Sequence, residues 1–245
     1  APATASDPAG SGWARATINS KGTLTLAGKL GDGTSFTAAL PADSAAHPGY
    51  CLFAQPYKPA RIDSFIGGSF QLLPHPSLPQ RRHLPEADLT WSKVGQPKDP
   101  GYRSGFPPLN TVLLIDPWQK PSKTAPLTQL LSTPGPVQVL HSPTGSAAQG
   151  DLPATITLTS AGKFTVAAPN ITKWQLKLNP ATGTFTGGFE LLDAGAKRKV
   201  PFSGALRQPA LPADTVIGEA HYLLPPATGA HTNEKTSGNI FLLRP

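Results

Sequence analysis

The sequence is almost free of sulfur, with one cysteine, Cys51, and no methionine. A single cysteine cannot form an intrachain disulfide, so the folded state has to be stabilised by burial of apolar side chains. We interpret Cys51, between Tyr50 and Leu52, as a small buried hydrophobe rather than a reactive thiol. The chain begins with alanine, and we expect a mature form after removal of a signal peptide, or a piece of a longer polypeptide.

Charged residues are also scarce, and long apolar runs are missing. Asp, Glu, Lys and Arg make up 14% of the chain, against roughly 25% in an average globular domain. No apolar stretch approaches the roughly 18 residues that a membrane-spanning helix needs, so we expect no membrane span.

The small charged fraction is nevertheless basic, with 21 Lys and Arg against 14 Asp and Glu and a formal net charge of +7. A basic balance favours contact with polyanions. We predict a basic patch from two dense groups, Arg81 and Arg82 in the first half and Lys197, Arg198 and Lys199 in the second. The alternative is that both groups are solvated strand ends. Neither group lies in a nucleic-acid-binding motif, so we expect no nucleic-acid partner.

Glycine and proline, by contrast, are abundant, at 24 and 29 residues. Such a content indicates either disorder or many turns. The apolar residues, 38% of the chain, fall in short alternating runs such as Thr23–Leu26, so we predict an all-β fold of short strands joined by turns. Residues 74–86 and 95–109 are expected to be proline-rich loops, and Leu127–Leu131 a short helical turn.

The order of these runs predicts two lobes. We expect a flexible leader over residues 1–12, a first β lobe over 13–122, a proline-rich linker over 123–136 and a second β lobe over 137–245. Strand centres recur roughly every 10–15 residues, which is typical of antiparallel β-barrels and β-sandwiches alike, so both architectures stay open.

An internal repeat indicates that the lobes are related. Residues 64–73 and 184–192 share a Phe-x-Gly-Gly strand, and residues 16–25 resemble 154–165 in their hairpin pattern. The shared order favours duplication, and convergence of hairpins on similar strings is the alternative. The paired glycines lie inside strands, where close packing explains them.

A longer series of strings resembles one class of protein. The strings are residues 22–25, 30–35, 179–189, 199–208, 218–224 and 237–242. Their order resembles the C-terminal β modules of large secreted bacterial surface proteins, which follow immunoglobulin-like repeats. The resemblance spans most of residues 13–245. It implies an extracellular location and a structural or adhesive role, and it brings no catalytic residues with it.

Patterns that carry catalysis are missing, and we predict no enzyme, no metal and no cofactor. A glycosidase needs two carboxylates roughly 5–10 Å apart, and Glu190 and Glu219 lie in neighbouring predicted strands. Alternation places Glu190 on the solvent side, which argues against this pair. No Cys, His and Asp spacing matches a zinc site. Asp32, between two glycines, is interpreted as part of a hairpin turn rather than as a calcium ligand.

Aromatic residues give the best argument for a binding site. Sugar-binding β modules stack sugar rings on exposed Trp and Tyr faces, because one face of a sugar ring is apolar. Four aromatic residues at predicted strand ends or in proline-rich loops are candidates for such a platform: Trp91, Trp118, Tyr57 and Tyr102. The alternative for each is packing in the core, where most large aromatic side chains lie.

These expectations combine into a secreted or cell-surface, non-catalytic structural or adhesive protein. Its expected partners are further copies of itself, with residues 1–12 packing on a neighbouring copy, or another surface protein. A carbohydrate-binding module, with an anionic polysaccharide as partner, is the first alternative function. A polysaccharide-active enzyme is the second.

Overall fold

The computed structural model describes residues 8, 10–43, 49–58, 62–76, 78–99, 101–131, 137–142, 154–159, 163–193, 196–208, 215–224 and 235–244. By its internal contacts the chain divides into two compact units. Of the described residues, unit 1 comprises those within 14–30 and 34–117, and unit 2 comprises those within 8–13, 31–33 and 118–245. The predicted lobe boundaries and the duplication between the lobes stay predictions.

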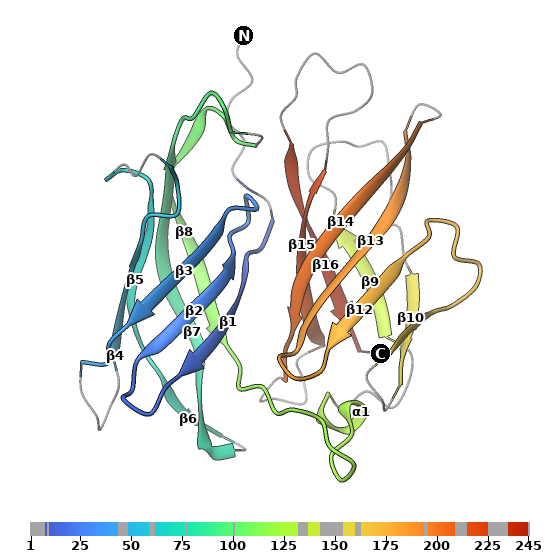
Figure 1. The fold of residues 1–245 in the computed structure, drawn as a ribbon, viewed down its shortest axis with the longest axis horizontal. Helices are drawn as coiled ribbons and strands as arrows, with labels where there is room; N and C mark the ends of the chain where they lie inside the picture. Colours follow the sequence, from blue (N-terminus) through green and yellow to red (C-terminus); the bar gives the residue numbers. More distant parts are fainter. Residues whose placement is uncertain are drawn as a thin grey trace. The chain divides into compact units, whose positions relative to one another are not determined.

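Unit 1 is built from strands that begin and end at turn residues. They are β1 (Trp13–Ile18), β2 (Leu24–Lys29), β3 (Ser35–Leu40), β4 (Gly49–Ala54), β5 (Phe65–Gln71), β6 (Leu73–His75), β7 (Leu78–Val94) and β8 (Gly105–Ile115). One sheet has the order β1-β2-β3 and the other the order β4-β5-β7-β6, with β8 paired to β7 (Figure 1). The pairings of β2 with β3 and among β4 to β8 are antiparallel.

The turn between β1 and β2 shows how local sequence ends a strand. Gly22 has a φ of +82°, a left-handed conformation that glycine adopts without steric cost. The side-chain oxygen of Asn19 accepts hydrogen bonds from the backbone N–H groups of Lys21 at 2.9 Å and Thr23 at 3.0 Å. These bonds satisfy backbone donors that the strand ladder leaves unpaired, so the hairpin pattern that the sequence shows over residues 16–25 is confirmed.

Alternation along β4 decides which side chains form the core of unit 1. Tyr50, Leu52 and Ala54 are buried, whereas Cys51 and Phe53 are exposed. Successive side chains of a strand point to opposite faces, so burying Tyr50 and Leu52 sends Cys51 outward. The prediction that Cys51 is buried is therefore wrong.

Prolines lie inside strands of unit 1 that we expected to be loops. β7 includes Pro85 and β8 includes Pro107 and Pro108. The β7–β8 pairing shifts register between Leu84 and Ala87, and again between Trp91 and Lys93 opposite the two β8 prolines. A bulge removes the need for a ladder N–H that proline lacks, so the strands continue through residues 78–86 and 105–109.

Unit 2 is dominated by one large sheet. Its elements are α1 (Leu127–Leu130), β9 (Val137–Ser142), β10 (Ala154–Leu158), β11 (Phe164–Val166), β12 (Gln175–Asn179), β13 (Thr184–Asp193), β14 (Ala196–Leu206), β15 (Val216–Leu224) and β16 (Thr236–Leu243). The antiparallel strand order is β11-β10-β9-β16-β15-β14-β13-β12 (Figure 1). Cα atoms of the terminal strands β11 and β12 come within 8 Å of each other, so the sheet is barrel-like and nearly closed.

The interior of this sheet holds an aromatic cluster. The ring of Trp174 stacks on Phe189 with centroids 4.6 Å apart and lies 5.6 Å from Phe202. Tyr222 meets Phe189 edge-on at 5.6 Å, and its burial raises the pKa of the Tyr222 hydroxyl. A Cβ on Gly187 would lie 2.2 Å from the Phe202 ring and from a β12 carbonyl oxygen, so close packing explains this glycine of the paired motif.

The short helical turn predicted at Leu127–Leu131 is confirmed by α1, whose Leu127 is buried in the core of unit 2, as is Leu131 after it. The expectation of an all-β fold with antiparallel sheets is confirmed as well. No helix within the described ranges has the length and hydropathy that crossing a membrane requires.

Candidate functional site

Three of the four aromatic residues predicted to form a ligand platform lie in the core of unit 1. Trp91, Tyr57 and Tyr102 are all buried, and this position favours the core-packing alternative for them. Trp118, in unit 2, is half-buried and packs beside that unit's core. Its indole N–H donates to the carbonyl oxygen of Pro180 at 3.1 Å.

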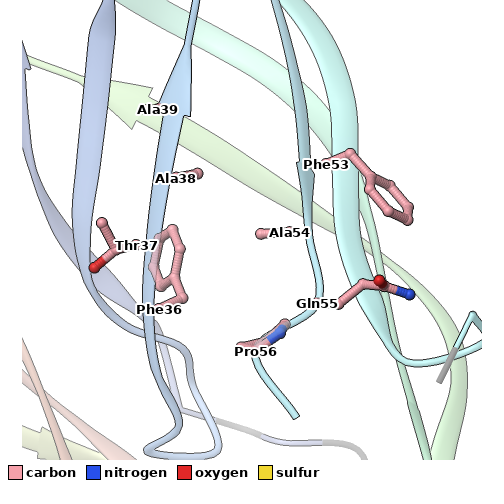
Figure 2. A pocket seen from close by; sticks show the side chains of 8 residues that line it. All are labelled: Phe36, Thr37, Ala38, Ala39, Phe53, Ala54, Gln55 and Pro56. Atoms are coloured by element: carbon pink, nitrogen blue, oxygen red, sulfur yellow. The ribbon is translucent and has the colours of Figure 1, made fainter. Parts of the chain in front are cut away.

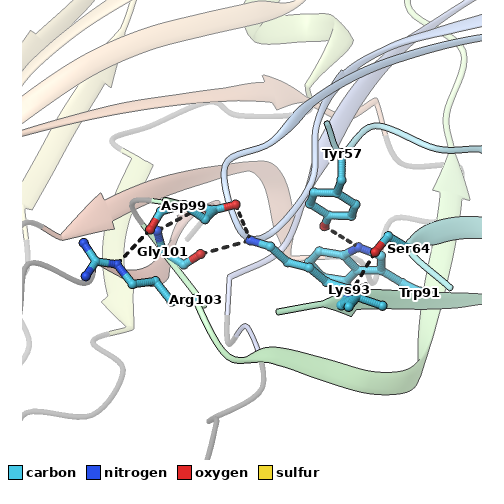
Figure 3. Close-up of polar contacts among 8 residues, drawn as sticks. Tyr57, Ser64, Trp91, Lys93, Asp99, Gly101 and Arg103 are labelled. Atoms are coloured by element: carbon cyan, nitrogen blue, oxygen red, sulfur yellow. Dashed lines mark hydrogen bonds and ion pairs between the residues drawn. The ribbon is translucent and has the colours of Figure 1, made fainter. Parts of the chain in front are cut away.

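The buried rings of unit 1 surround a lysine that sequence reasoning missed. The indole N–H of Trp91 donates to the hydroxyl of Tyr57 at 2.9 Å, as Figure 3 shows. The Nζ atom of Lys93 lies 5.1 Å from the ring centroid of Tyr57 and 5.9 Å from that of Tyr102. An ammonium group at these distances from a ring is attracted by its negative face, so the two rings help to stabilise a buried cation.

The charge of Lys93 is balanced within the same network. Its side chain is fully buried, and Nζ lies 2.8 Å from Oδ2 of Asp99. Nζ also donates to the carbonyl oxygen of Gly101 at 2.9 Å, and Nε of Arg103 donates to the Asp99 carbonyl at 3.0 Å (Figure 3). These bonds attach the segment after β7 to the sheet. A lysine held by a carboxylate, a carbonyl and two rings is a structural cation rather than a reactive amine.

A buried histidine pair lies where β6 meets β7. The rings of His75 and His83 have centroids 5.2 Å apart at an interplanar angle of 69°, and both side chains are buried. Nδ1 of His75 accepts a hydrogen bond from the backbone N–H of Leu78 at 3.1 Å. Burial lowers the pKa of His75, the neighbouring His83 lowers it further, and Asp116 opposes both effects.

Acidification is therefore expected to weaken unit 1. The pKa of His75 is lower in the folded state than its ordinary value of 6.5. The neutral side chain therefore contributes fully to the free energy of unfolding above pH 6.5, and this contribution is lost as the pH falls below 6.5. The loss from one proton cannot exceed about 1.4 kcal/mol per pH unit. Thermal unfolding between pH 7.5 and 5 measures it.

The variant His75→Asn separates this effect from general acid sensitivity. Its side-chain oxygen can accept the Leu78 N–H bond and does not titrate, so the change in melting temperature between pH 7.5 and 5 should be smaller than in the unmodified chain. An identical pH dependence in both proteins would remove His75 as the cause.

The two groups of the predicted basic patch lie in different units. Arg81 and Arg82 are exposed on β7 of unit 1. On β14 of unit 2, Lys197 and Lys199 are exposed and Arg198 is half-buried. Alternation explains the difference within β14, because Arg198 shares the face of the buried Val200.

The carboxylates considered for glycoside hydrolysis are far apart. Glu190 is opposite Lys199 of β14, and Glu219 is opposite Ala205. These partners are six positions apart on one strand, which corresponds to roughly 20 Å at 3.3–3.4 Å per residue, beyond the roughly 5–10 Å that the mechanism requires. Glu190 instead pairs with Lys173 at 2.9 Å. Among the described residues, no three His, Cys, Asp or Glu side chains are grouped so that they could hold a metal ion.

The described part of the expected leader belongs to unit 2. The backbone N–H of Gly10 donates to the hydroxyl of Ser237 at 3.0 Å, and that of Ser11 donates to the side-chain oxygen of Asn239. The indole N–H of Trp13 donates to the Ser203 hydroxyl at 3.1 Å. Residues 10–13 thus lie along β14 and β16. Residues 1–7 and 9, which complete the expected leader, lie outside the described residues.

A hollow of about 330 Å³ lies between β3 and β4 in unit 1. These are terminal strands of two different sheets. Figure 2 shows Phe36, Ala54 and Pro56 pointing toward the space between the strands, whereas Phe53 and Gln55 point away from it. Phe53 is 57% exposed and stacks on Phe65 with centroids 5.7 Å apart. The ring pair places exposed apolar area beside the hollow. Neither feature was predicted from the sequence.

Comparisons with protein-family models, curated proteins and solved structures found no match. The resemblance to modules of bacterial surface proteins therefore stays a prediction, and the geometry of the described residues carries the functional argument.

Proposed function

We propose that this protein is an extracellular, non-catalytic structural or adhesive component of a cell surface, and that it associates with further copies of itself through the β3–β4 edge of unit 1. The observation that carries this proposal is the exposed ring of Phe53 on a terminal strand, beside the β3–β4 hollow. The extracellular setting is supported by the composition and by the resemblance of residues 13–245 to secreted surface modules.

The chemistry of this edge suits a protein partner with an extended strand. A terminal strand presents backbone N–H and C=O groups that another strand can pair with. Exposed aromatic side chains are enriched where proteins meet, because their burial removes a large apolar area from water. Phe53 and Phe65 supply such an area on the outer face, next to the β3–β4 hollow.

The variant Phe53→Lys tests this edge. A lysine at this exposed position leaves the core intact but places a charge in the contact, so self-association should weaken by about tenfold or more. Size-exclusion chromatography with light scattering, at several protein concentrations, measures the change.

Ile171→Lys is the matched control, because Ile171 is 83% exposed and lies in a turn of unit 2. It introduces the same charge at a distant part of the sequence and should leave association unchanged. Equal weakening by both substitutions would show that net charge, and not the β3–β4 edge, governs assembly.

A further inference from the structure

The outer face of β12, β13 and β14 in unit 2 collects lysines that are separate in the sequence. Phe185 and Phe189 of β13 point into the core, so Thr186 and Glu190 point outward. The register places Lys177 of β12 opposite Thr186 and Lys199 of β14 opposite Glu190. Lys177 and Lys199 therefore lie on one face of the sheet, and both are exposed.

Lys197 extends the same face. It is two positions from Lys199 on β14, has the same parity and is exposed. From the level of Lys197 to the level of Lys177 the face runs six residues along β13, a length of roughly 20 Å. Three strands span it in the other direction. We refer to Lys177, Lys197 and Lys199 on this face as the lysine strip.

The carboxylate on this face does not neutralise the strip. Glu190 is held by Lys173, whose Nζ lies 2.9 Å from its Oε2, and the two side chains are 18% and 55% exposed. The hydrogen bond from Lys173 lowers the pKa of Glu190, and the charges of Lys173, Lys197 and Lys199 add to the effect against a smaller opposing effect of burial. Glu190 is thus paired by a fourth lysine, and the strip keeps a net positive charge among the described residues.

We propose that the lysine strip binds a linear anionic polysaccharide that carries carboxylate or sulfate groups. Ammonium groups on flexible stems act as point charges that adapt to such groups without a fixed fork geometry. Between the lysines, the exposed Gln175 and Thr186 offer an amide and a hydroxyl for the sugar hydroxyls. The inference rests on the proposed function in that it names the ligand of an adhesive surface protein.

The side chains on the face favour a glycan over a nucleic acid. Proteins that bind single strands stack the bases on aromatic rings, and the described outward side chains of β12, β13 and β14 include no aromatic ring. The indole of Trp13 reaches this face at Ser203, where its N–H is already used in a hydrogen bond. Lys177 is opposite Thr186, and Lys199 is opposite Glu190. A DNA duplex is therefore the competitor that the test has to include.

The test compares two triple variants with the same charge. Lys177→Gln/Lys197→Gln/Lys199→Gln removes the lysine strip, and Lys21→Gln/Lys58→Gln/Lys98→Gln removes three exposed lysines of unit 1. Each lowers the formal net charge from +7 to +4. Isothermal titration with heparin, with a polyuronate, with neutral dextran and with a mixed-sequence DNA duplex measures binding at fixed salt, and far-ultraviolet circular dichroism checks that both variants fold.

We expect the unmodified chain to bind heparin or the polyuronate and not dextran. The strip variant should bind about tenfold or more weakly, since three charge contacts are lost, whereas the unit 1 variant should change by less than about threefold. Equal losses in both variants, no binding by the unmodified chain, or tighter binding of DNA that depends on the same lysines would each overturn the inference.

Glycan binding by the lysine strip and self-association through the β3–β4 edge can be tested independently of each other. Phe53→Lys lies in unit 1 and should leave polysaccharide binding by the strip intact. The strip variant should still self-associate. Loss of glycan binding without loss of association, or the reverse, therefore shows which of the two proposals fails.

Discussion

Replacing Trp174 with alanine is expected to lower the free energy of unfolding of unit 2 by about 3–5 kcal/mol, the usual cost of deleting a large buried aromatic side chain. Trp174 is 2% exposed and contacts Phe189 and Phe202 in the centre of the barrel-like sheet. Its removal leaves a cavity that surrounding strands can fill only in part, because each is held by ladders on both sides. Urea denaturation followed by circular dichroism measures the loss.

The variant Trp174→Phe is the control, and it isolates packing from hydrogen bonding. The buried indole nitrogen has no hydrogen-bond partner among the described residues. Replacement by phenylalanine should therefore reduce the buried apolar area without removing a hydrogen bond. It should lower the free energy of unfolding clearly less than replacement by alanine. If Trp174→Phe destabilises the protein as much as Trp174→Ala, the indole N–H donates a hydrogen bond that stabilises the folded state. If Trp174→Ala lowers the free energy of unfolding by less than about 1 kcal/mol, Trp174 is not packed in a buried aromatic cluster.

The second large effect is expected at Lys93. Removing one member of a buried ion pair typically costs about 3–5 kcal/mol, because the other charge stays buried without compensation. Asp99 keeps 17% of its side-chain surface, and partial solvation reduces the penalty. We therefore expect Lys93→Met to lower the free energy of unfolding of unit 1 by about 2–3 kcal/mol.

Two further variants make the Lys93 experiment decisive. Lys98→Met changes an exposed lysine in the neighbouring turn and should cost less than about 0.5 kcal/mol. The double variant Lys93→Met/Asp99→Asn removes both charges and should recover part of the loss, because no buried charge is left without a partner. A Lys93→Met variant as stable as Lys98→Met would show that the ion pair does not hold the segment after β7.

Much of the fold was predictable because strand alternation and turn chemistry are local. The hairpin at Gly22 and the helical turn at Leu127 follow from short stretches of sequence. The errors also have a local cause. Cys51 is exposed because its neighbours Tyr50 and Leu52 take the inward face, and a five-residue apolar run does not reveal which parity is buried.

The candidate sites were harder to predict because they depend on pairing between strands. Lys177 and Lys199 share a face only through the register of two ladders, and no sequence spacing encodes that register. Lys93 gave a usable signal, since it shares the parity of Leu89 and Trp91 on β7. The same alternation places Trp91 in the core. The prediction of an exposed aromatic platform did not take this alternation into account.

Sedimentation velocity of the unmodified chain over a wide range of concentrations tests the central claim most directly. A subunit that associates through the β3–β4 edge predicts species heavier than the 25.5 kDa monomer, in a proportion that rises with concentration. A single 25.5 kDa species at every concentration would contradict the proposal that this protein assembles with copies of itself.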